Sequence, residues 1–242
     1  MLQGFLSCSV KSLPSDSAHP TGLYCLDMAE NKTEAANEEV DNKDKVEGKE
    51  NAEVVDLGPF EIVIGQQIPS IFFKFQFKNV EYSSGRNKTF LCYSVEQQGA
   101  DCQKMQGYVE DEHTSTHAEE AFFAEVFKEC NGSLKYSITW HVSSSPCAAC
   151  ASKIAEFLKK SPNVRLTIFM ARLFMWEEPE IQQGLQLLKA AGCRLKIMKA
   201  PEYNYCWSTY VENEGESFVP WEDLQPSSLA YEGILNEILQ RA

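Results

Sequence analysis

Basic residues are scarce in this chain of 242 residues. It has 22 Lys and Arg but 35 Asp and Glu, so its formal net charge is −13. Proteins that bind nucleic acid without sequence preference hold the phosphates through Lys and Arg and are usually basic. The charge therefore excludes a histone-like role and a general single-strand-coating role. It still allows a nucleic acid to be held in one local groove.

Long apolar runs are missing as well. No stretch approaches the roughly 20 residues that a transmembrane helix needs. At the N-terminus, Leu2, Phe5 and Leu6 are not preceded by the basic residues of a signal peptide. The nine Cys are scattered along the chain, and we expect reduced thiols, some of them free to bind a metal. We predict a cytoplasmic and nuclear protein without a membrane partner, whose strand edges permit homo-oligomers.

Aromatic residues are absent from an acidic stretch near the N-terminus. Residues 1–57 hold 5 Lys and Arg but 12 Asp and Glu, and Met28–Asp56 is dominated by Glu, Asp, Asn, Lys and Ala. Such a segment cannot bury enough apolar surface to offset the conformational entropy that folding removes. We predict a disordered acidic N-terminal tail over residues 1–57, with a transient helix within Glu30–Val55 as the alternative. Residues 58–242 are predicted to form one α/β domain.

Strand and helix patterns alternate along residues 58–242. The alternating run Phe72–Phe77 favours a strand, although Ser70 could cap a short helix there. This alternation of elements predicts a central sheet covered by helices. Further strands are expected at Thr89–Gln97, Gly107–Glu110, Tyr136–Val142, Val164–Ala171 and Arg194–Met198, and helices at His117–Cys130, Cys147–Lys160, Pro179–Ala191, Pro201–Tyr210 and Ser227–Arg241.

Two short motifs at the starts of predicted helices carry metal-binding side chains. The first is His117-Ala118-Glu119, and the second is Pro146-Cys147-Ala148-Ala149-Cys150. Cysteines at positions i and i+3 lie on one face of a helical turn, so both sulfur atoms can reach the same ion. One imidazole and two thiolates suit Zn²⁺, which prefers nitrogen and sulfur ligands in a tetrahedron. We therefore predict one zinc ion per chain, bound by His117, Cys147 and Cys150.

Three protein ligands are typical of a catalytic zinc, because they leave a fourth position for water. Glu119 is two residues from His117 and is placed to transfer the protons of that water as a general acid and base. The alternatives for the two cysteines are a redox pair or simple packing. A structural zinc would need a fourth ligand, for which His113 is the nearest candidate, although a solvated loop suits His113 better.

The two motifs match the H-x-E and P-C-x-x-C signature of zinc nucleobase deaminases. Further matching stretches are Gly85–Tyr93 (GRNKTFLCY), Ile138–Trp140 (ITW) before Ser145–Cys147 (SPC), Ala171–Glu180 (ARLFMWEEPE) and Pro220–Asp223 (PWED). On these residues the chain resembles the AID/APOBEC cytidine deaminases, in particular their second, muscle-type subgroup, from about Gly58 to the C-terminus. Residues 1–27 lie outside the resemblance, and we expect them to be an upstream extension, because Met28 looks like a family member's own start.

The resemblance implies a cytidine deaminase fold of the α/β class, with a five-stranded mixed sheet surrounded by about six helices. It also implies that Pro69–Val80 forms the first helix, against the alternation noted above. The implied activity is hydrolytic deamination of cytosine to uracil in RNA or single-stranded DNA, with Glu119 as the catalytic residue. The implied substrate-binding residues are Arg86, Asn87, Thr89, Trp140, Ser145, Phe174 and Trp176.

Three departures from the family pattern predict weak activity. Ser144 stands where the family usually has a Trp, so one stacking contact, worth roughly 1–3 kcal/mol per base, is lost. Asp111 stands where several relatives have an Asn and would repel a phosphate-bearing substrate. Glu81 precedes the loop at the mouth of the site and could occupy the fourth zinc position, although a solvated loop charge is the simpler interpretation.

Three other functions remain open from the sequence. A deaminase-fold regulator that binds nucleic acid or chromatin with little or no catalysis would explain Ser144, Asp111 and the acidic charge. Deamination of free nucleosides or nucleotides is disfavoured, because those enzymes usually have Cys where this chain has His117. Adenine is chemically allowed as the target base, but the resemblance favours cytosine.

Overall fold

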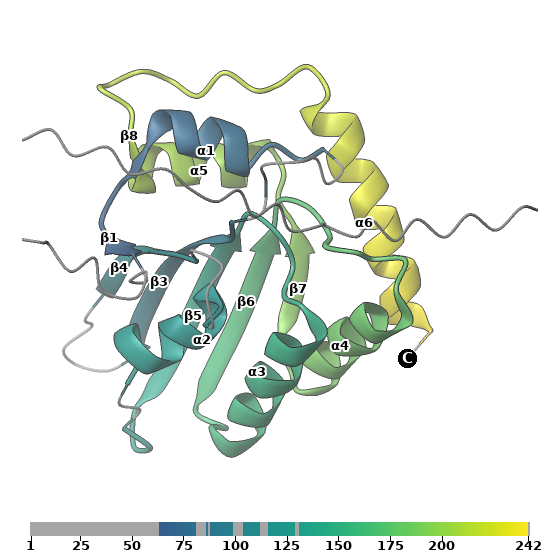
Figure 1. Cartoon of the computed structure of the whole chain (residues 1–242). Helices are drawn as coiled ribbons and strands as arrows, with labels where there is room; N and C mark the ends of the chain where they lie inside the picture. The colour runs from purple at the N-terminus through teal and green to yellow at the C-terminus, as the bar shows by residue number, and fades with distance from the viewer. Residues whose placement is uncertain are drawn as a thin grey trace, which may run out of the picture. The chain divides into compact units, whose positions relative to one another are not determined.

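A computed structural model describes residues 63–80, 86, 88–98, 104–111, 116–128 and 131–241 of the chain (Figure 1). All of these residues belong to one compact unit, residues 54–242. The predicted acidic tail, residues 1–57, lies outside the described residues, and so do Glu81, Asn87 and His113. The fold is therefore that of the predicted α/β domain.

A mixed sheet forms the centre of the domain, with its strands in the order β1-β4-β3-β5-β6-β7. β3 runs antiparallel to both β4 and β5, whereas β5, β6 and β7 run parallel to one another. Parallel neighbours need long crossover connections, and helices supply them here. The strands are β1 (Val63–Gly65), β3 (Phe90–Gln98), β4 (Lys104–Glu110), β5 (Lys135–Val142), β6 (Val164–Met170) and β7 (Arg194–Ile197).

The expected five strands are present, and the described sheet has a sixth. β1 is only three residues long and pairs antiparallel with the outer edge of β4, where Val63 lies opposite Glu110. Its side chains are exposed or half-buried, so no alternation of apolar and polar residues could reveal it. A second small sheet pairs β2 (Ile68–Pro69) with β8 (Val211–Glu212) in parallel.

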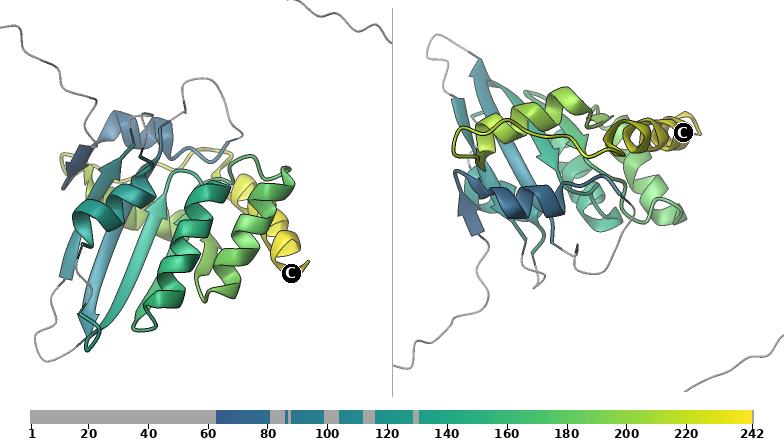
Figure 2. Two further views of the ribbon diagram at one scale, coloured as in Figure 1. Left: turned by 60° about the horizontal axis from the view of Figure 1, so that its bottom comes forward. Right: turned by 90° about the horizontal axis from the view of Figure 1, so that it is seen from above.

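Helices cover both faces of the sheet. One apolar core lies between the sheet and α2, α3, α4 and α6, and a second lies between the sheet and α1 with α5 (Figures 1 and 2). Among the described residues no helix is both long enough and apolar enough to cross a membrane. The helices are α1 (Ser70–Gln76), α2 (Ala118–Ala121), α3 (Ala148–Lys160), α4 (Pro179–Ala190), α5 (Ala200–Tyr210) and α6 (Leu224–Gln240).

The helix that the resemblance implied for Pro69–Val80 is confirmed in a shorter form, α1, and the strand that the alternation of Phe72–Phe77 favoured is wrong, because these residues lie in and directly after that helix. Phe73 and Phe77 are four positions apart, both fully buried, and their rings stack at 4.6 Å. Phe72 and Phe75 lie 50% and 42% exposed. The buried side chains thus follow the helical spacing. Ser70 makes no cap, since Pro69 occupies the N-cap position without a side-chain hydrogen bond.

The predicted helix His117–Cys130 is shorter and changes type. After α2 the chain continues as one π-helical turn, η1 (Phe122–Val126), in which the amide of Phe127 donates to the carbonyl of Phe122 at 2.8 Å. An i→i+5 turn places residues five apart over one another. Accordingly, the rings of Phe122 and Phe127 stack with 6.1 Å between centroids.

Candidate metal centre and substrate cavity

Four strand ends meet at one end of the sheet. They are the start of β3 and the ends of β4, β5 and β6. The segments that follow or precede these strand ends carry the chemistry predicted from the sequence. Crevices at the carboxyl ends of parallel strands are the usual ligand sites of open α/β sheets.

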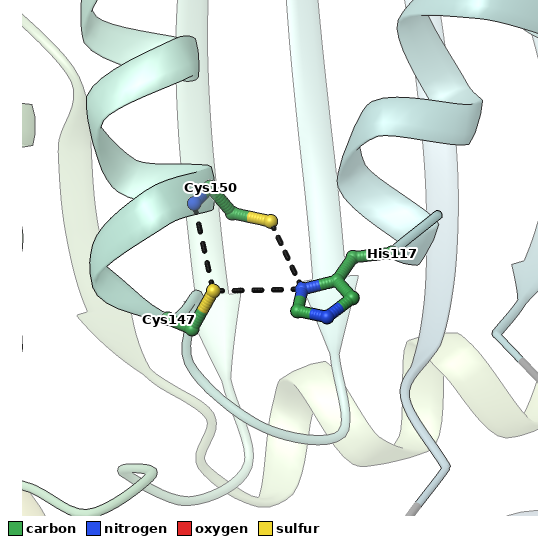
Figure 3. Close-up of side chains that lie close together, drawn as sticks. All are labelled: His117, Cys147 and Cys150. Carbon is green, nitrogen blue, oxygen red and sulfur yellow. Dashed lines mark hydrogen bonds between the residues drawn. The ribbon is translucent and has the colours of Figure 1, made fainter. Parts of the chain in front are cut away.

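His117 and Cys147 occupy the N-cap positions of α2 and α3, and both have extended backbones. The Cys147 sulfur accepts a hydrogen bond from the amide of Cys150 at 3.5 Å. This contact folds the Cys147–Cys150 turn so that both sulfur atoms face His117 (Figure 3). The two motifs, far apart in sequence, are thus brought together by the starts of two helices.

The geometry of this cluster fits a tetrahedral zinc site. His117 Nδ1 lies 3.2 Å from Cys150 Sγ and 3.5 Å from Cys147 Sγ. One ligand atom from each of the three residues lies within 4.8 Å of the others. Ligand bonds of about 2.0–2.1 Å to nitrogen and 2.3 Å to sulfur at tetrahedral angles separate the two atoms by about 3.5 Å. The group could therefore hold a metal ion with little rearrangement.

Without a metal, the pKa shifts favour the metal-binding form at Cys147 only, and not at Cys150 or His117. Hydrogen bonds from Cys150, together with nearby His117, lower the pKa of Cys147 to about 5, whereas the hydrogen bond to Cys147 and burial raise that of Cys150. Burial lowers the pKa of His117, but the charges of Cys147 and Glu119 outweigh it, so that the net shift is upward. Zinc binding needs both thiolates and a neutral imidazole, and would release the remaining protons.

Glu119 is almost completely buried beside this cluster, with 4% of its surface exposed. Desolvation raises the pKa of its carboxyl group to about 7. A carboxyl group with a pKa near neutrality can both accept and donate a proton at physiological pH. Its place in the structure therefore suits the acid–base role predicted from the sequence.

Glu119 opens into a cavity of about 350 Å³, which we call the site cavity. Four of the predicted substrate-binding residues line it, namely Arg86, Thr89, Ser145 and Phe174. Asn87, also predicted, lies outside the described residues, as does the proposed fourth metal ligand Glu81. The remaining wall consists of Lys88, Asp111, His117, Ser144, Cys147 and Arg172.

Neither of the two predicted tryptophans lines the site cavity. Trp140 is fully buried in the core and packs edge-on against Phe122, with 5.0 Å between ring centroids. Its side chain points to the sheet face that α2 and α3 cover, so direct contact with a base in the site cavity is contradicted. Trp176 lines a neighbouring cavity of about 610 Å³ together with Phe174, Glu177 and Glu178. Phe174 alone among the described residues lines both.

The serines near the site hold its loops together. Ser143 Oγ accepts a hydrogen bond from the amide of Phe90 at 3.0 Å, and Ser145 Oγ accepts one from the amide of Phe174 at 2.8 Å. The amide of Ser145 donates to the carbonyl of Arg172 at 3.0 Å. Ser143 and Ser145 thus tie the end of β5 to β3 and to the loop after β6, a supporting role that sequence reasoning did not find.

The basic residues of the site cavity are engaged by the protein itself. Lys88 Nζ donates to Glu110 Oε1 at 2.7 Å, and Arg172 donates to the carbonyl of Gln76. Arg86 Nε donates to the carbonyl of Phe75 at 2.9 Å, and its guanidinium lies 4.6 Å from the centre of that ring. Of these partners, only the Glu110 carboxylate offsets a positive charge, whereas the carbonyl partners of Arg86 and Arg172 hold the side chains in place and leave their charges intact.

Comparisons with known proteins identify the family of the chain. The family model described as APOBEC2 matches residues 61–240. The C->U-editing enzyme APOBEC-2 of Mus musculus is 54% identical over 220 residues, which cover 87% of this chain and 98% of the relative. The enzyme of the same name from Homo sapiens is 54% identical over 214 residues, covering 86% and 96%.

A more distant relative shares the same domain. The DNA dC->dU-editing enzyme APOBEC-3 of Mus musculus is 36% identical over 173 residues, which cover 69% of this chain and 39% of that protein. The mixed sheet with its six helices is consistent with the cytidine deaminase fold that the sequence motifs implied. The chain belongs to the APOBEC2 family.

Proposed function

We propose that this chain is a zinc-dependent cytidine deaminase that converts cytosine to uracil in RNA or single-stranded DNA with low activity. One observation supports this most strongly. His117, Cys147 and Cys150 place three ligand atoms together, and the buried Glu119 lines the same cavity as His117 and Cys147. This is the donor set and the acid–base group that hydrolytic deamination of a nucleobase needs.

Three described residues of the site, Glu119, Ser145 and Phe174, have a part in the proposed reaction. Zinc, when bound, supplies a Lewis acid that lowers the pKa of water to about 7. Glu119 would take a proton from the attacking water and pass protons to the base, so that cytosine and water give uracil and ammonia. Ser145 fixes the backbone of Phe174, and we assign to Phe174 the face against which the base stacks.

Three features of the cavity wall support low activity. Ser144 offers no aromatic surface, and Asp111 is 5% exposed and places an acidic group on the wall. Lys88, which could attract a phosphate, is paired with Glu110. We propose that the substrate is held by few contacts, so that turnover is slow even where the proton transfer is competent.

The test is deamination of a panel of single-stranded RNA and DNA oligonucleotides by the purified, zinc-loaded protein. Glu119→Ala is the matched control, because it removes the acid–base group while the three ligands stay. We expect slow uracil formation that the control lacks. Equal uracil signals from the two proteins, in every sequence context and at high enzyme concentration, would rule out this function. Cytidine and dCMP, added to the panel, test the free nucleoside alternative.

The second candidate is a nucleic-acid or chromatin-binding regulator with little or no catalysis. Asp111 and Ser144 on the cavity wall favour it, because both weaken the grip on a substrate. An experiment in cells distinguishes the two candidate functions. If Glu119→Ala abolishes the cellular effect while binding survives, the regulator is excluded; if the effect survives without Glu119, deamination is not what the cell uses.

A further inference from the structure

The outer face of α1, the helix along the top of the domain in Figure 1, exposes two aromatic rings. Phe72 is 50% exposed and Phe75 42%, and Ile71 beside them is 70% exposed. The rings of Phe73 and Phe77, in contrast, are fully buried and anchor the helix in the core. Residues three positions apart lie side by side on a helix, with about 5–6 Å between their Cβ atoms. Phe72 and Phe75 therefore form one exposed strip, which we call the aromatic strip.

Arg86 joins the aromatic strip to the site cavity. Its guanidinium lies 4.6 Å from the centre of the Phe75 ring, and its Nε donates to the Phe75 carbonyl at 2.9 Å. The same Arg86 lines the site cavity together with Glu119. The ring of Phe72 stacks on that of Phe90, the first residue of β3, with 6.4 Å between centroids. A strand that leaves the cavity over Arg86 thus reaches Phe75 and Phe72.

The charge of α1 does not oppose a polyanion. The segment Ser70–Val80 contains Lys74 and Lys78 and no acidic residue, although the whole chain has a net charge of −13. The ammonium group of Lys74 lies 5.0 Å from the centre of the Trp207 ring, a contact that holds the side chain and leaves its charge. A phosphate chain is therefore not repelled here, in contrast to the cavity wall at Asp111.

Exposed aromatic rings beside an arginine are typical contacts for single-stranded nucleic acid. Unpaired bases stack on phenylalanine rings and on guanidinium planes. The bases of a duplex are already stacked on one another and cannot do so. A protein partner that covers an apolar surface, in contrast, gains from an aliphatic side chain such as Ile71 as well as from a ring. The two kinds of partner can therefore be distinguished by substitution.

We propose that the aromatic strip binds the nucleotides next to the target cytosine: one neighbouring base stacks on Phe75 and Arg86, and the next stacks on Phe72. The inference rests on the proposed function, because the strand must place its target base in the site cavity. Stacking supplies affinity that the few cations of that cavity do not, and it releases no counterions, so it depends little on salt. The strip thus selects a single strand over a duplex.

Loss of either ring should weaken the binding of single-stranded RNA. Stacking of one base contributes about 5- to 150-fold to affinity, and we expect at least about fivefold weaker binding in Phe72→Leu and in Phe75→Leu. Phe75→Trp keeps a ring and should keep the affinity. Ile71→Ala is the matched control, because it removes exposed apolar surface from the same helix but no ring. Arg86 donates to the backbone of Phe75, so this hydrogen bond does not depend on the substituted side chain.

The experiment is a fluorescence anisotropy titration of the full-length, zinc-loaded protein. The probe is a labelled RNA of about 15 uridines with one central cytidine, and a duplex of the same length is the second ligand. Each titration is made at several salt concentrations, and circular dichroism checks that every variant is folded. Weaker binding of the single strand in both leucine variants, with an unchanged salt slope and with full affinity in Ile71→Ala and Phe75→Trp, supports the strip.

Three results overturn the inference. Equal affinities of the unaltered protein and the leucine variants would mean that the strand does not contact α1. Equal losses in Ile71→Ala and in the leucine variants would show a general apolar contact and not stacking. A changed oligomeric state of the leucine variants in analytical ultracentrifugation, with unchanged RNA affinity, would assign the strip to a contact between copies of the chain.

The failure of the inference is distinct from the failure of the proposed function. Each of the three results leaves uracil formation that depends on Glu119 untouched. A protein that forms no such uracil would refute the proposed deaminase, whereas the loss of affinity in Phe72→Leu and Phe75→Leu would still be measured.

Discussion

Trp140 and Trp176 lie close to the site in sequence but differ in their surroundings. Trp140 is fully buried and packs against the rings of Phe122 and Phe123. We expect Trp140→Ala to lower the free energy of unfolding by about 3–5 kcal/mol, because it empties a large space in the core. Trp176→Ala, at a half-buried position, should cost clearly less. Urea unfolding of both variants measures this; equal losses would contradict the assignment of Trp140 to the core.

The buried side chain of His141 makes the stability of the fold depend on pH. It is 4% exposed, stacks on Phe169 at 5.0 Å, and its Nδ1 has no hydrogen-bond partner among the described residues. Burial lowers its pKa from 6.5 to about 4, although Glu96 and Glu202 line the same cavity. Folding therefore favours the neutral ring. Above about pH 6.5 the ring is neutral in the folded and the unfolded chain, so His141 does not make stability depend on pH there. As pH falls from there to about 4, the unfolded chain binds the proton more readily, and the free energy of unfolding decreases by about 3 kcal/mol.

The measurement is the free energy of unfolding at intervals between pH 7.5 and pH 4. His141→Phe keeps an aromatic ring against Phe169 but removes the proton site, so its curve should fall less steeply over this window. Parallel curves for the two proteins would show that other groups cause the acid sensitivity.

How far the site could be predicted differs from residue to residue. The i, i+3 spacing of Cys147 and Cys150, together with His117 and Glu119, predicted a cluster that the structure assembles. The buried position of Trp140 was open to prediction, because Tyr136, Ile138 and Trp140 alternate with polar residues along β5 and burial follows that alternation. The ion pair of 2.6 Å between Glu120 and Lys153 carried no sequence signal, since it depends on how α2 lies against α3.

At the scale of whole elements, the contact between α3 and α4 supports the metal ligands. Gly184 of α4 faces α3, and a Cβ atom there would lie 3.1 Å from the Cβ of Ala151 and 3.3 Å from the Cα of Ala148. Both alanines are neighbours of the ligands Cys147 and Cys150. A larger side chain at position 184 would therefore push α4 against the turn that carries the two thiols.

We expect Gly184→Val to reduce the free energy of unfolding by about 1–3 kcal/mol through overpacking and also to weaken zinc binding. Gly233 of α6 is the matched control, because a Cβ atom there meets nothing within 4 Å. Gly233→Ala should raise stability by up to about 1 kcal/mol, since alanine favours a helix. Thermal unfolding of the two variants, measured with and without zinc, tests the stability changes and the weaker zinc binding. A Gly184→Val protein of unchanged stability would contradict the close contact.

Most elements were predictable because their apolar spacing is regular. The helices α3 and α4 and the strands β5 and β6 lie within one or two residues of their predicted bounds. α1 was not predictable from alternation, because four phenylalanines in six residues fit a strand as well as a helix. The π turn after α2 was also not predictable, since its extra residue depends on how Phe122 and Phe127 pack in the core.

At the scale of the whole molecule, charge limits how the domain can hold a polynucleotide. The site cavity offers three cations, Arg86, Lys88 and Arg172. If they alone meet phosphates, the logarithm of the binding constant for single-stranded RNA should fall with the logarithm of salt concentration with a slope no steeper than about −2. Arg86→Gln should reduce that slope by about 0.7. A slope beyond about −4 in a fluorescence titration would reveal a broader basic surface than the described residues show.

The most direct test of the central claim compares crosslinked binding sites with uracil positions in cells that carry either the unaltered protein or Glu119→Ala. The zinc cluster with Glu119 predicts that both proteins crosslink to the same nucleic acids, and that uracil in place of cytosine is found near those sites with the unaltered protein only. Identical uracil maps for the two proteins, with crosslinks retained, would contradict a catalytic role and leave binding as the function of this domain.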